Sequence, residues 1–303
     1  MSESVRRTEI HSSEAIGVVF EPLSESEHFA VMLSGSSGGI PEAPARRLAE
    51  NGVTAFALGY HGAPGLPSDL VDIPIESLAR GIELFRARFA RQRSVGVVGM
   101  SRGAELALLL AAYLGDAIGR VVAVAPSHVV WSGLKAPGPG DRRTTRSTWT
   151  WRGAPLAFVA NRADIEPVFN ERGLRVDVYC DFTSYEPAEI DPARIPVERS
   201  AGPILLLSGD DDHMWPAAAM AAEIVRRMQE HGRGGDVSNV VYPGAGHMFL
   251  VRDFLPPARA GNAPMFDFGG TAQADEVANR DGWRRVVEFL QGSRRLSGME
   301  TAV

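Results

Sequence analysis

The sequence predicts an α/β protein whose mostly parallel central sheet carries helices on both faces. Short runs that are apolar almost throughout suit strands buried on both faces, and they occupy residues 29–35, 53–60, 94–100, 120–126, 203–210 and 237–243. Longer segments space their apolar residues as amphipathic helices do, at 41–51, 74–91, 102–115, 216–232 and 276–291. Strands that alternate with helices indicate a parallel sheet built from crossover connections.

The ends of these helical segments carry suitable residues. Pro41, Pro74 and Pro216 stand at the starts of three of them. Proline fits the first helical turn because its missing N–H would have no partner there in any case. Gly52 follows the first segment, and glycine ends a helix at little steric cost. The residues at the ends therefore support the same elements as the apolar periodicity.

Two stretches interrupt the alternation of strands and helices. Residues 127–202, directly after the strand at 120–126, are rich in Pro, Gly, Arg and Trp, and an insertion of this length is typical of a lid or pocket wall. Residues 249–275 are also irregular, and we expect them to close the other side of the same pocket. Because no internal repeat divides the chain, we expect one domain, residues 1–303, with 127–202 as an insertion within it.

Composition excludes several classes of function. The net charge of −6 and the pI near 5.7 provide no broad positive field for nucleic acid or an anionic membrane surface. No run of about 18 apolar residues suggests a membrane span. Cys180 is the single cysteine and the seven histidines are scattered, so we expect no disulfide, metal site or cofactor, and a cytoplasmic location.

A candidate nucleophile lies in the pentapeptide Gly99-Met100-Ser101-Arg102-Gly103, between a predicted strand and a predicted helix. A nucleophilic serine at such a strand-to-helix turn needs small neighbours, because the turn is tight and the hydroxyl must be exposed. The alternative is a glycine-rich helix start capped by Ser101. The flanking strand and helix favour the nucleophile.

A serine hydroxyl needs a base and an orienting carboxylate to attack a carbonyl. His247 follows the run at 237–243, and Asp210, Asp211 and Asp212 follow the run at 203–210. The spacing from Gly209 favours Asp212, with Asp211 as the alternative, and we interpret His213 as a pocket-wall or packing residue rather than the base. The chain order Ser, Asp, His is that of α/β-hydrolases.

Two sources of oxyanion-hole donors are available. One is the backbone N–H of Arg102, which follows the nucleophile at the start of its helix. The other is the glycine-rich loop after the first predicted strand, where Ser36 is our first candidate and Ser37 the second. The loop has no Walker lysine, which argues against a nucleotide-phosphate loop. His61 and Trp131 are either pocket-lining or ordinary packing residues, and packing is the simpler interpretation.

The stretch from Ser34 to the last helix resembles the C-terminal catalytic domain shared by acyl-CoA thioesterases and bile acid-CoA:amino acid N-acyltransferase. The matching segments are SGSSGGIPE, GMSRGAEL, IPVERSAGPILLLSGDDDHMW and YPGAGHMF, in the same order. The resemblance implies an α/β-hydrolase fold, a triad of Ser101, Asp212 and His247, and an acyl thioester as substrate. The N-acyltransferase branch carries cysteine at the elbow, whereas this chain has Ser101, which favours water as the acceptor.

The leading hypothesis is therefore a serine hydrolase that cleaves a small-molecule acyl thioester, CoA-linked or carrier-bound, through an acyl-Ser101 intermediate. Arg142, Arg143 and Arg146 in the insertion are candidates for contact with CoA phosphates, or else belong to a solvated loop. The alternatives keep the triad but change the donor or acceptor, giving a carboxylesterase, an amidase, an acyltransferase or a cyclase. A binding protein on an inactive hydrolase fold is the alternative outside enzymes. The sequence leaves the oligomeric state open.

Overall fold

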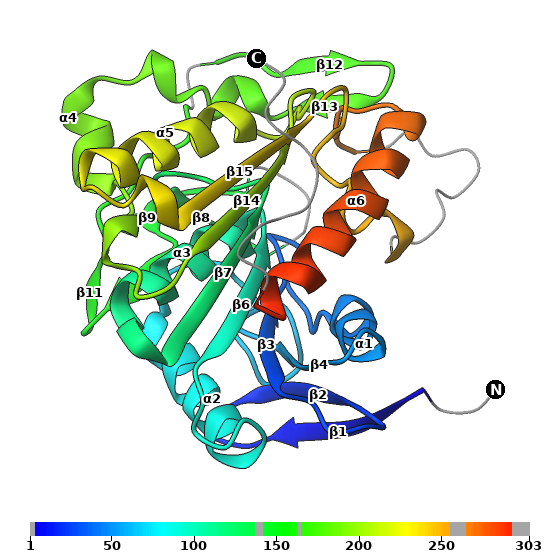
Figure 1. The fold of residues 1–303 in the computed structure, drawn as a ribbon. Coiled ribbons are helices and arrows are strands. Elements are labelled where there is room, and N and C mark those ends of the chain that lie inside the picture. The colour runs from blue at the N-terminus through cyan, green and yellow to red at the C-terminus, as the bar shows by residue number, and fades with distance from the viewer. Residues whose placement is uncertain (1–3, 137–141, 163–164, 255–264, 293–303) are drawn as a thin grey trace.

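The computed structural model describes residues 4–136, 142–162, 165–254 and 265–292. An eight-stranded sheet runs through its centre in the order β1-β2-β4-β3-β6-β7-β14-β15 (Figure 1). Its strands are β1 (Val5–His11), β2 (Ile16–Pro22), β3 (His28–Leu33), β4 (Val53–Leu58), β6 (Val95–Met100), β7 (Ile118–Val124), β14 (Ile204–Gly209) and β15 (Val237–Tyr242). From β4 to β15 all neighbours are parallel, which confirms the predicted sheet.

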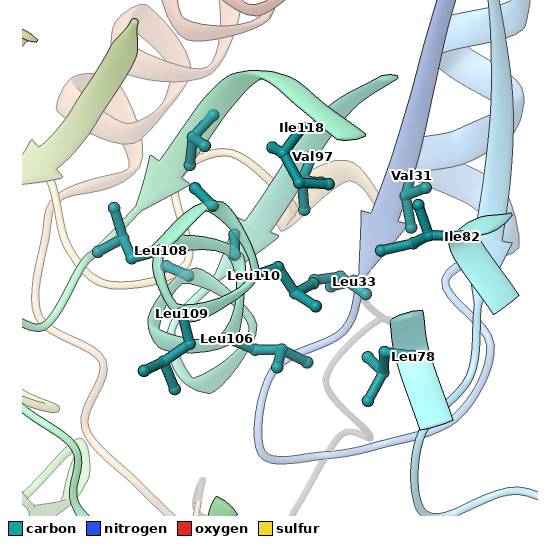
Figure 2. Close-up of a cluster of buried hydrophobic side chains, with 14 of the residues drawn as sticks. Val31, Leu33, Leu78, Ile82, Val97, Leu106, Leu108, Leu109, Leu110 and Ile118 are labelled. Atoms are coloured by element: carbon teal, nitrogen blue, oxygen red, sulfur yellow. The ribbon is translucent and has the colours of Figure 1, made fainter. Parts of the chain in front are cut away.

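Five longer helices cover the two faces of the sheet (Figure 1). They are α1 (Glu42–Glu50), α2 (Ile75–Arg88), α3 (Arg102–Leu114), α5 (Ala217–Glu230) and α6 (Ala272–Leu290). Apolar residues of α2, α3 and α5 share one core with one face of the sheet, whereas those of α1 and α6 share a second core with the other face. Figure 2 shows the first core, in which Leu110 of α3 lies next to Leu33 of β3.

The sequence prediction began the sheet at residue 29 and missed the two strands before it. β1 pairs antiparallel with β2, and β2 pairs antiparallel with β4, so this hairpin forms the edge at the bottom of Figure 1. Most residues of β1 are exposed or half-buried. A polar edge strand of this kind lacks the continuous apolar run that identifies central strands. This reason does not apply to β2, whose residues 17–20 form a buried run.

The segment between β7 and β14 holds several short elements. β8 (Ser132–Leu134) pairs with β9 (Arg143–Ser147). β10 (Trp149–Trp151) joins β11 (Ala154–Pro155) and β5 (Ile73–Pro74), which lies outside the segment. β12 (Val168–Asn170) pairs with β13 (Gly173–Arg175), and α4 (Pro187–Ile190) follows. These small ladders surround a third hydrophobic cluster, in which Trp131, Tyr179 and Tyr185 of the segment pack with Trp215.

Buried polar side chains attach this segment to α3. Glu105 is fully buried, and its Oε1 accepts a hydrogen bond from Trp149 Nε1 at 2.6 Å. Arg102 pairs with Glu105 at 3.2 Å and donates from Nη2 to Ser132 O at 2.9 Å. Burial raises the pKa of Glu105, although the Arg102 charge and the Trp149 N–H lower it. The first turns of α3 thus hold the inserted segment in place.

Candidate active site

Ser101 lies at the turn between β6 and α3 with φ 57° and ψ −122°. A positive φ is costly for a residue with a side chain and is often found at functional turns. The backbone N–H of Ser101 donates to Val124 O at the end of β7 (2.9 Å). This bond fixes the strained turn to the neighbouring strand, at the end of the sheet where α/β proteins bind their ligands.

The two glycines of the pentapeptide are required by close backbone contacts. A Cβ atom on Gly99 would lie 1.9 Å from Gly103 O, and one on Gly103 would lie 2.3 Å from Ser34 O. No side chain fits at either distance. The glycines therefore let β3, β6 and the start of α3 approach closely enough to form the elbow.

His247 and Asp212 form a buried pair. His247 Nδ1 and Asp212 Oδ2 are 2.7 Å apart, and the two side chains are 4% and 2% exposed. The other oxygen of Asp212, Oδ1, accepts hydrogen bonds from the backbone N–H groups of Met214 (2.8 Å) and Trp215 (3.2 Å). Asp212 is thereby held so that it orients the imidazole, as the carboxylate of a catalytic triad does.

The three consecutive aspartates have different partners. Asp210 Oδ1 accepts from Gly244 N (2.6 Å), and Asp211 Oδ2 accepts from Gly270 N (2.9 Å). Asp211 Oδ1 lies 3.0 Å from His213 Nε2. Of the three, Asp212 is the one that contacts His247. The geometry therefore pairs His247 with Asp212, the first candidate from the sequence. Asp211 instead contacts Gly270 and His213 in the neighbouring loops.

His213 belongs to a second charged cluster beside the acid. Its Nδ1 lies 2.7 Å from Asp267 Oδ2, and Asp267 also contacts Asn170 and Arg172. Burial raises the pKa of Asp267, but the hydrogen bonds from Asn170 and His213 outweigh it and lower that pKa to about 2. The cluster connects the loop after β14 to the β12–β13 hairpin through His213, whose ring nitrogens face the carboxylates of Asp211 and Asp267.

Trp215 contacts both the base and the side chain of Arg102. Its ring meets the His247 ring edge-on, with centroids 5.9 Å apart, and the Arg102 guanidinium carbon lies 5.8 Å from the Trp215 ring centre. Among the described residues, no hydrogen bond joins Ser101 to His247, whose backbone N–H donates to Phe268 O (2.8 Å). Hydrogen bonds of this kind are often long without substrate. No local pattern indicates the contact between Trp215 and His247, and the one hint is that Trp215 follows Asp212 by three residues.

The glycine-rich loop lies beside the nucleophile. A Cβ on Gly35 would lie 3.4 Å from Ser101 Cβ and 4.0 Å from Ser101 Oγ. Within the loop, Gly38 N–H donates to Gly35 O and Gly39 N–H donates to His61 O. Among the described residues, the N–H groups of Ser36, Ser37 and Arg102 have no acceptor. All three sequence candidates for the oxyanion hole therefore remain available as donors.

Tyr60 and His61 support this loop from behind. Tyr60 OH donates to Ser34 O at 2.6 Å, and His61 Nε2 lies 3.3 Å from Gly35 O. Burial lowers the pKa of His61, which favours a neutral ring. His61 is buried at 2% exposure, so it packs against the loop. Trp131 is fully buried as well. The burial of both side chains favours ordinary packing over a pocket-lining role.

Cys180 is far less suited to nucleophilic attack than Ser101. It is 4% exposed, and burial raises the pKa of its thiol to about 12. Within the described residues, no group of three or more His, Cys, Asp or Glu side chains could hold a metal ion. The helices of that part of the chain also include none with the length and apolar character needed to cross a membrane.

The irregular stretch at 249–275 is partly outside the described residues, which omit 255–264. Phe249 and Leu250 pack in the core with α6. At its other end, Phe268 O accepts a hydrogen bond from the backbone N–H of His247, and Gly269 forms an isolated antiparallel β-bridge with Asp212. The described parts of this stretch therefore contact the base and the acid directly.

The chain is similar in sequence to curated proteins that act on acyl-coenzyme A, by their names. An acyl-coenzyme A thioesterase 6 from Mus musculus is 26% identical over 96% of this chain and 66% of its own length. An acyl-coenzyme A amino acid N-acyltransferase 2, also from Mus musculus, is 26% identical over 97% of this chain and 67% of its own. The chain thus spans about two thirds of the length of these relatives.

A solved structure and a family model complete the comparison. The acylaminoacyl peptidase of Pyrococcus horikoshii superimposes with a TM-score of 0.59 at 12% identity, covering 98% of this chain and 42% of that one. This likeness shows the fold, which is that of the α/β-hydrolases. The family model described as BAAT / Acyl-CoA thioester hydrolase C terminal matches residues 79–294. The chain belongs to the BAAT / acyl-CoA thioester hydrolase C-terminal family.

Proposed function

We propose that this protein hydrolyses acyl thioesters through an acyl-Ser101 intermediate. The observation that carries the proposal is the arrangement of a serine at a strained elbow and a buried His247–Asp212 pair, in a chain of this family. His247 removes the proton from Ser101, whose Oγ then attacks the thioester carbonyl. His247 returns the proton to the departing thiol, and then activates a water that releases the acid.

The negative oxygen that forms during attack needs N–H donors. The backbone N–H of Arg102 lies at the start of α3, where the helix dipole adds positive potential. Ser36 or Ser37 supplies the second donor from the loop next to Ser101. One such donor contributes about 2.7 to 4 kcal/mol of transition-state stabilisation. Because Tyr60 and His61 hold the loop, the donors are fixed before substrate arrives.

A second candidate function is acyl transfer to an amine, which the N-acyltransferase relative favours. It would use the same acyl-enzyme with a different acceptor, since the site fixes the reaction class and the pocket fixes the substrates. Carboxylesterase or amidase activity would change the donor in the same way. Serine at the elbow favours water as the acceptor here.

We also propose that the chain forms one domain and that residues 127–202 act as its lid. Their attachment to α3 beside the nucleophile supports this placement. The single, buried cysteine suits a reducing compartment, and we propose the cytoplasm.

The test is thiol release from a panel of acyl-CoA esters, measured beside p-nitrophenyl esters of matched chain length, with and without added amine. Ser101→Ala and Asp212→Asn should each lower kcat by about 10⁴-fold or more. Asp211→Asn is the matched control and should retain most of the activity. Circular dichroism should show that the variants are folded.

Three outcomes would contradict parts of this proposal. Substantial activity in Ser101→Ala would exclude the acyl-serine mechanism. Equal losses in Asp211→Asn and Asp212→Asn would exclude the specific role of Asp212. Faster cleavage of oxygen esters than of thioesters would leave the triad in place and reject the thioester as substrate.

A further inference from the structure

A cationic pocket lies between the inserted segment and the loop before β5, and its lining includes no residue of the triad. Its volume is about 740 Å³, within the usual range for small-molecule sites. The charged residues that line it are Lys135, Arg143, Arg146, Arg162, Asp69 and Glu189. Four positive groups therefore face two negative ones, on a chain whose net charge is −6. A concave surface of this sign concentrates anions.

Both acidic groups of the pocket already accept backbone hydrogen bonds. Asp69 Oδ1 accepts from Ala136 N at 2.8 Å. Glu189 Oε2 accepts from Glu186 N at 3.1 Å and so caps α4. These bonds stabilise the two carboxylates in structural positions. The carboxylates keep their charges, and the cationic groups of the lining outnumber them by four to two.

The cationic side chains are fixed to different degrees. Arg143 donates from Nη1 to Arg162 O at 2.7 Å, and its guanidinium carbon lies 5.1 Å from the Tyr179 ring centre. Arg162 donates to Ser184 O at 3.2 Å. Arg146 pairs with Asp72 while its side chain is 67% exposed, and Lys135 is exposed. The pocket thus combines two arginines held in place with two groups that can adjust to a ligand.

Arg142 connects this pocket to the candidate active site. Its Nη2 lies 3.5 Å from Ser36 O in the loop beside Ser101, and its Nε donates to Lys135 O at 2.8 Å. Arg143, the next residue, lines the pocket, and neighbouring Cα atoms are about 3.8 Å apart. One arginine therefore spans the distance between the oxyanion loop and the pocket wall.

We propose that this pocket binds the phosphate groups of a nucleotide thiol carrier, the chemical class of CoA, while the acyl thioester lies at Ser101. The inference rests on the proposed function. A carrier with several phosphates accounts for four cations better than a single phosphate does, because one Arg can bind a phosphate through two parallel hydrogen bonds. The long, flexible pantetheine arm would run past Arg142 from the pocket to the elbow.

The first test measures binding without catalysis. CoA, dephospho-CoA, 4′-phosphopantetheine and pantetheine are titrated into the Ser101→Ala protein by calorimetry. CoA should bind about tenfold or more tightly than pantetheine, and its affinity should fall as salt is added. Equal affinities for CoA and pantetheine would overturn the proposal. Equal affinities for CoA and 4′-phosphopantetheine would overturn the nucleotide carrier and indicate a carrier with one phosphate.

The second test uses kinetics in the otherwise wild-type protein. Arg146→Ala and the double variant Lys135→Ala/Arg146→Ala should raise KM for an acyl-CoA by about fivefold and about twentyfold, with kcat unchanged. Neither should change turnover of the matching N-acetylcysteamine thioester, which has no phosphate. Arg280→Ala is the matched control, because Arg280 is also exposed (72%) and paired with an acid, Glu276.

The outcomes separate this inference from the proposed function. If CoA binds through these cations but no thioester is cleaved, the pocket stands and the proposed function fails. If thioesters are cleaved and the Arg146 and Lys135 variants have wild-type KM for acyl-CoA, the function stands and the pocket proposal fails.

Discussion

The elbow after β6 and the insertion between β7 and β14 lie next to each other but are held in different ways. At the elbow, backbone atoms leave no room for side chains at Gly99 and Gly103. In the insertion, side chains make the contacts, since Trp149 donates to Glu105 of α3 while Trp131 and its apolar neighbours pack in a separate cluster. The backbone constraint at the elbow requires glycines at neighbouring positions, so it appears as a motif in the sequence. Side-chain contacts between distant residues leave no such motif.

The largest expected effect tests the backbone constraint. Gly99→Ala places a Cβ 1.9 Å from Gly103 O, so the elbow must open, and we expect a loss of about 4 kcal/mol in the free energy of unfolding, or no folded protein. Gly153→Ala in the insertion is the control, because its φ is +77° but nothing lies within 4 Å of the added Cβ. It should cost only about 1 kcal/mol. Urea unfolding measures both, and equal losses would show that the two regions do not differ in this way.

The next effect tests the side-chain attachment. Glu105→Ala leaves Arg102 buried without its partner and removes the acceptor of Trp149. Loss of one partner from a buried pair costs about 3 kcal/mol or more. Glu83→Ala is the matched control, since Glu83 pairs with Arg86 at the same spacing on α2 but is 55% exposed. It should cost less than about 0.5 kcal/mol.

Unfolding of both glutamate variants in urea decides between the alternatives. A small loss in Glu105→Ala would mean that the insertion is held by its own short strands. Restored stability in a Glu105→Ala protein that also carries Arg102→Met would identify the uncompensated buried charge as the cause of the loss.

The same difference explains what could be predicted from the sequence. The central strands and the triad order follow from runs of apolar residues and from motifs that adjoin them. Asp212 was favoured by its spacing, but only the structure shows that Asp211 turns to Gly270 and His213 instead. The His213–Asp267 contact joins residues 54 positions apart, and no local pattern encodes such a pair.

Polar edges and side-chain clusters account for the remaining misses. β1 was missed because it is mostly exposed. The cationic pocket combines residues from 69 to 189 in the chain. Of these, the sequence pattern indicates only the arginine-rich stretch as a candidate binding region. That stretch divides in the structure, since Arg142 turns to the oxyanion loop while Arg143 and Arg146 line the pocket. Which arginine faces which site depends on the strand that forms there, and composition carries no information on this.

The smallest expected effect concerns His128, at the start of the insertion. It is 4% exposed, and within the described residues neither ring nitrogen has a hydrogen-bond partner. Burial lowers the pKa of His128 to about 4, with Arg194 and Arg226 acting in the same direction and Glu223 opposing them. The unfolded chain binds this proton near pH 6.5. The folded state is therefore favoured while the ring is neutral, and this contribution is lost as pH falls from about 6.5 toward 4.

Between about pH 8 and pH 5 the loss from this single group amounts to about 2 kcal/mol. His128→Leu should remove that part of the pH dependence and leave the protein relatively more stable at the acidic end, as measured by urea unfolding across the range. His231→Leu, which removes an exposed histidine, controls for the loss of one titrating group. If His128→Leu kept the wild-type slope, the ring would have to be solvated or paired in the native state. The start of the insertion would then be less tightly packed than its contact with Phe182 indicates.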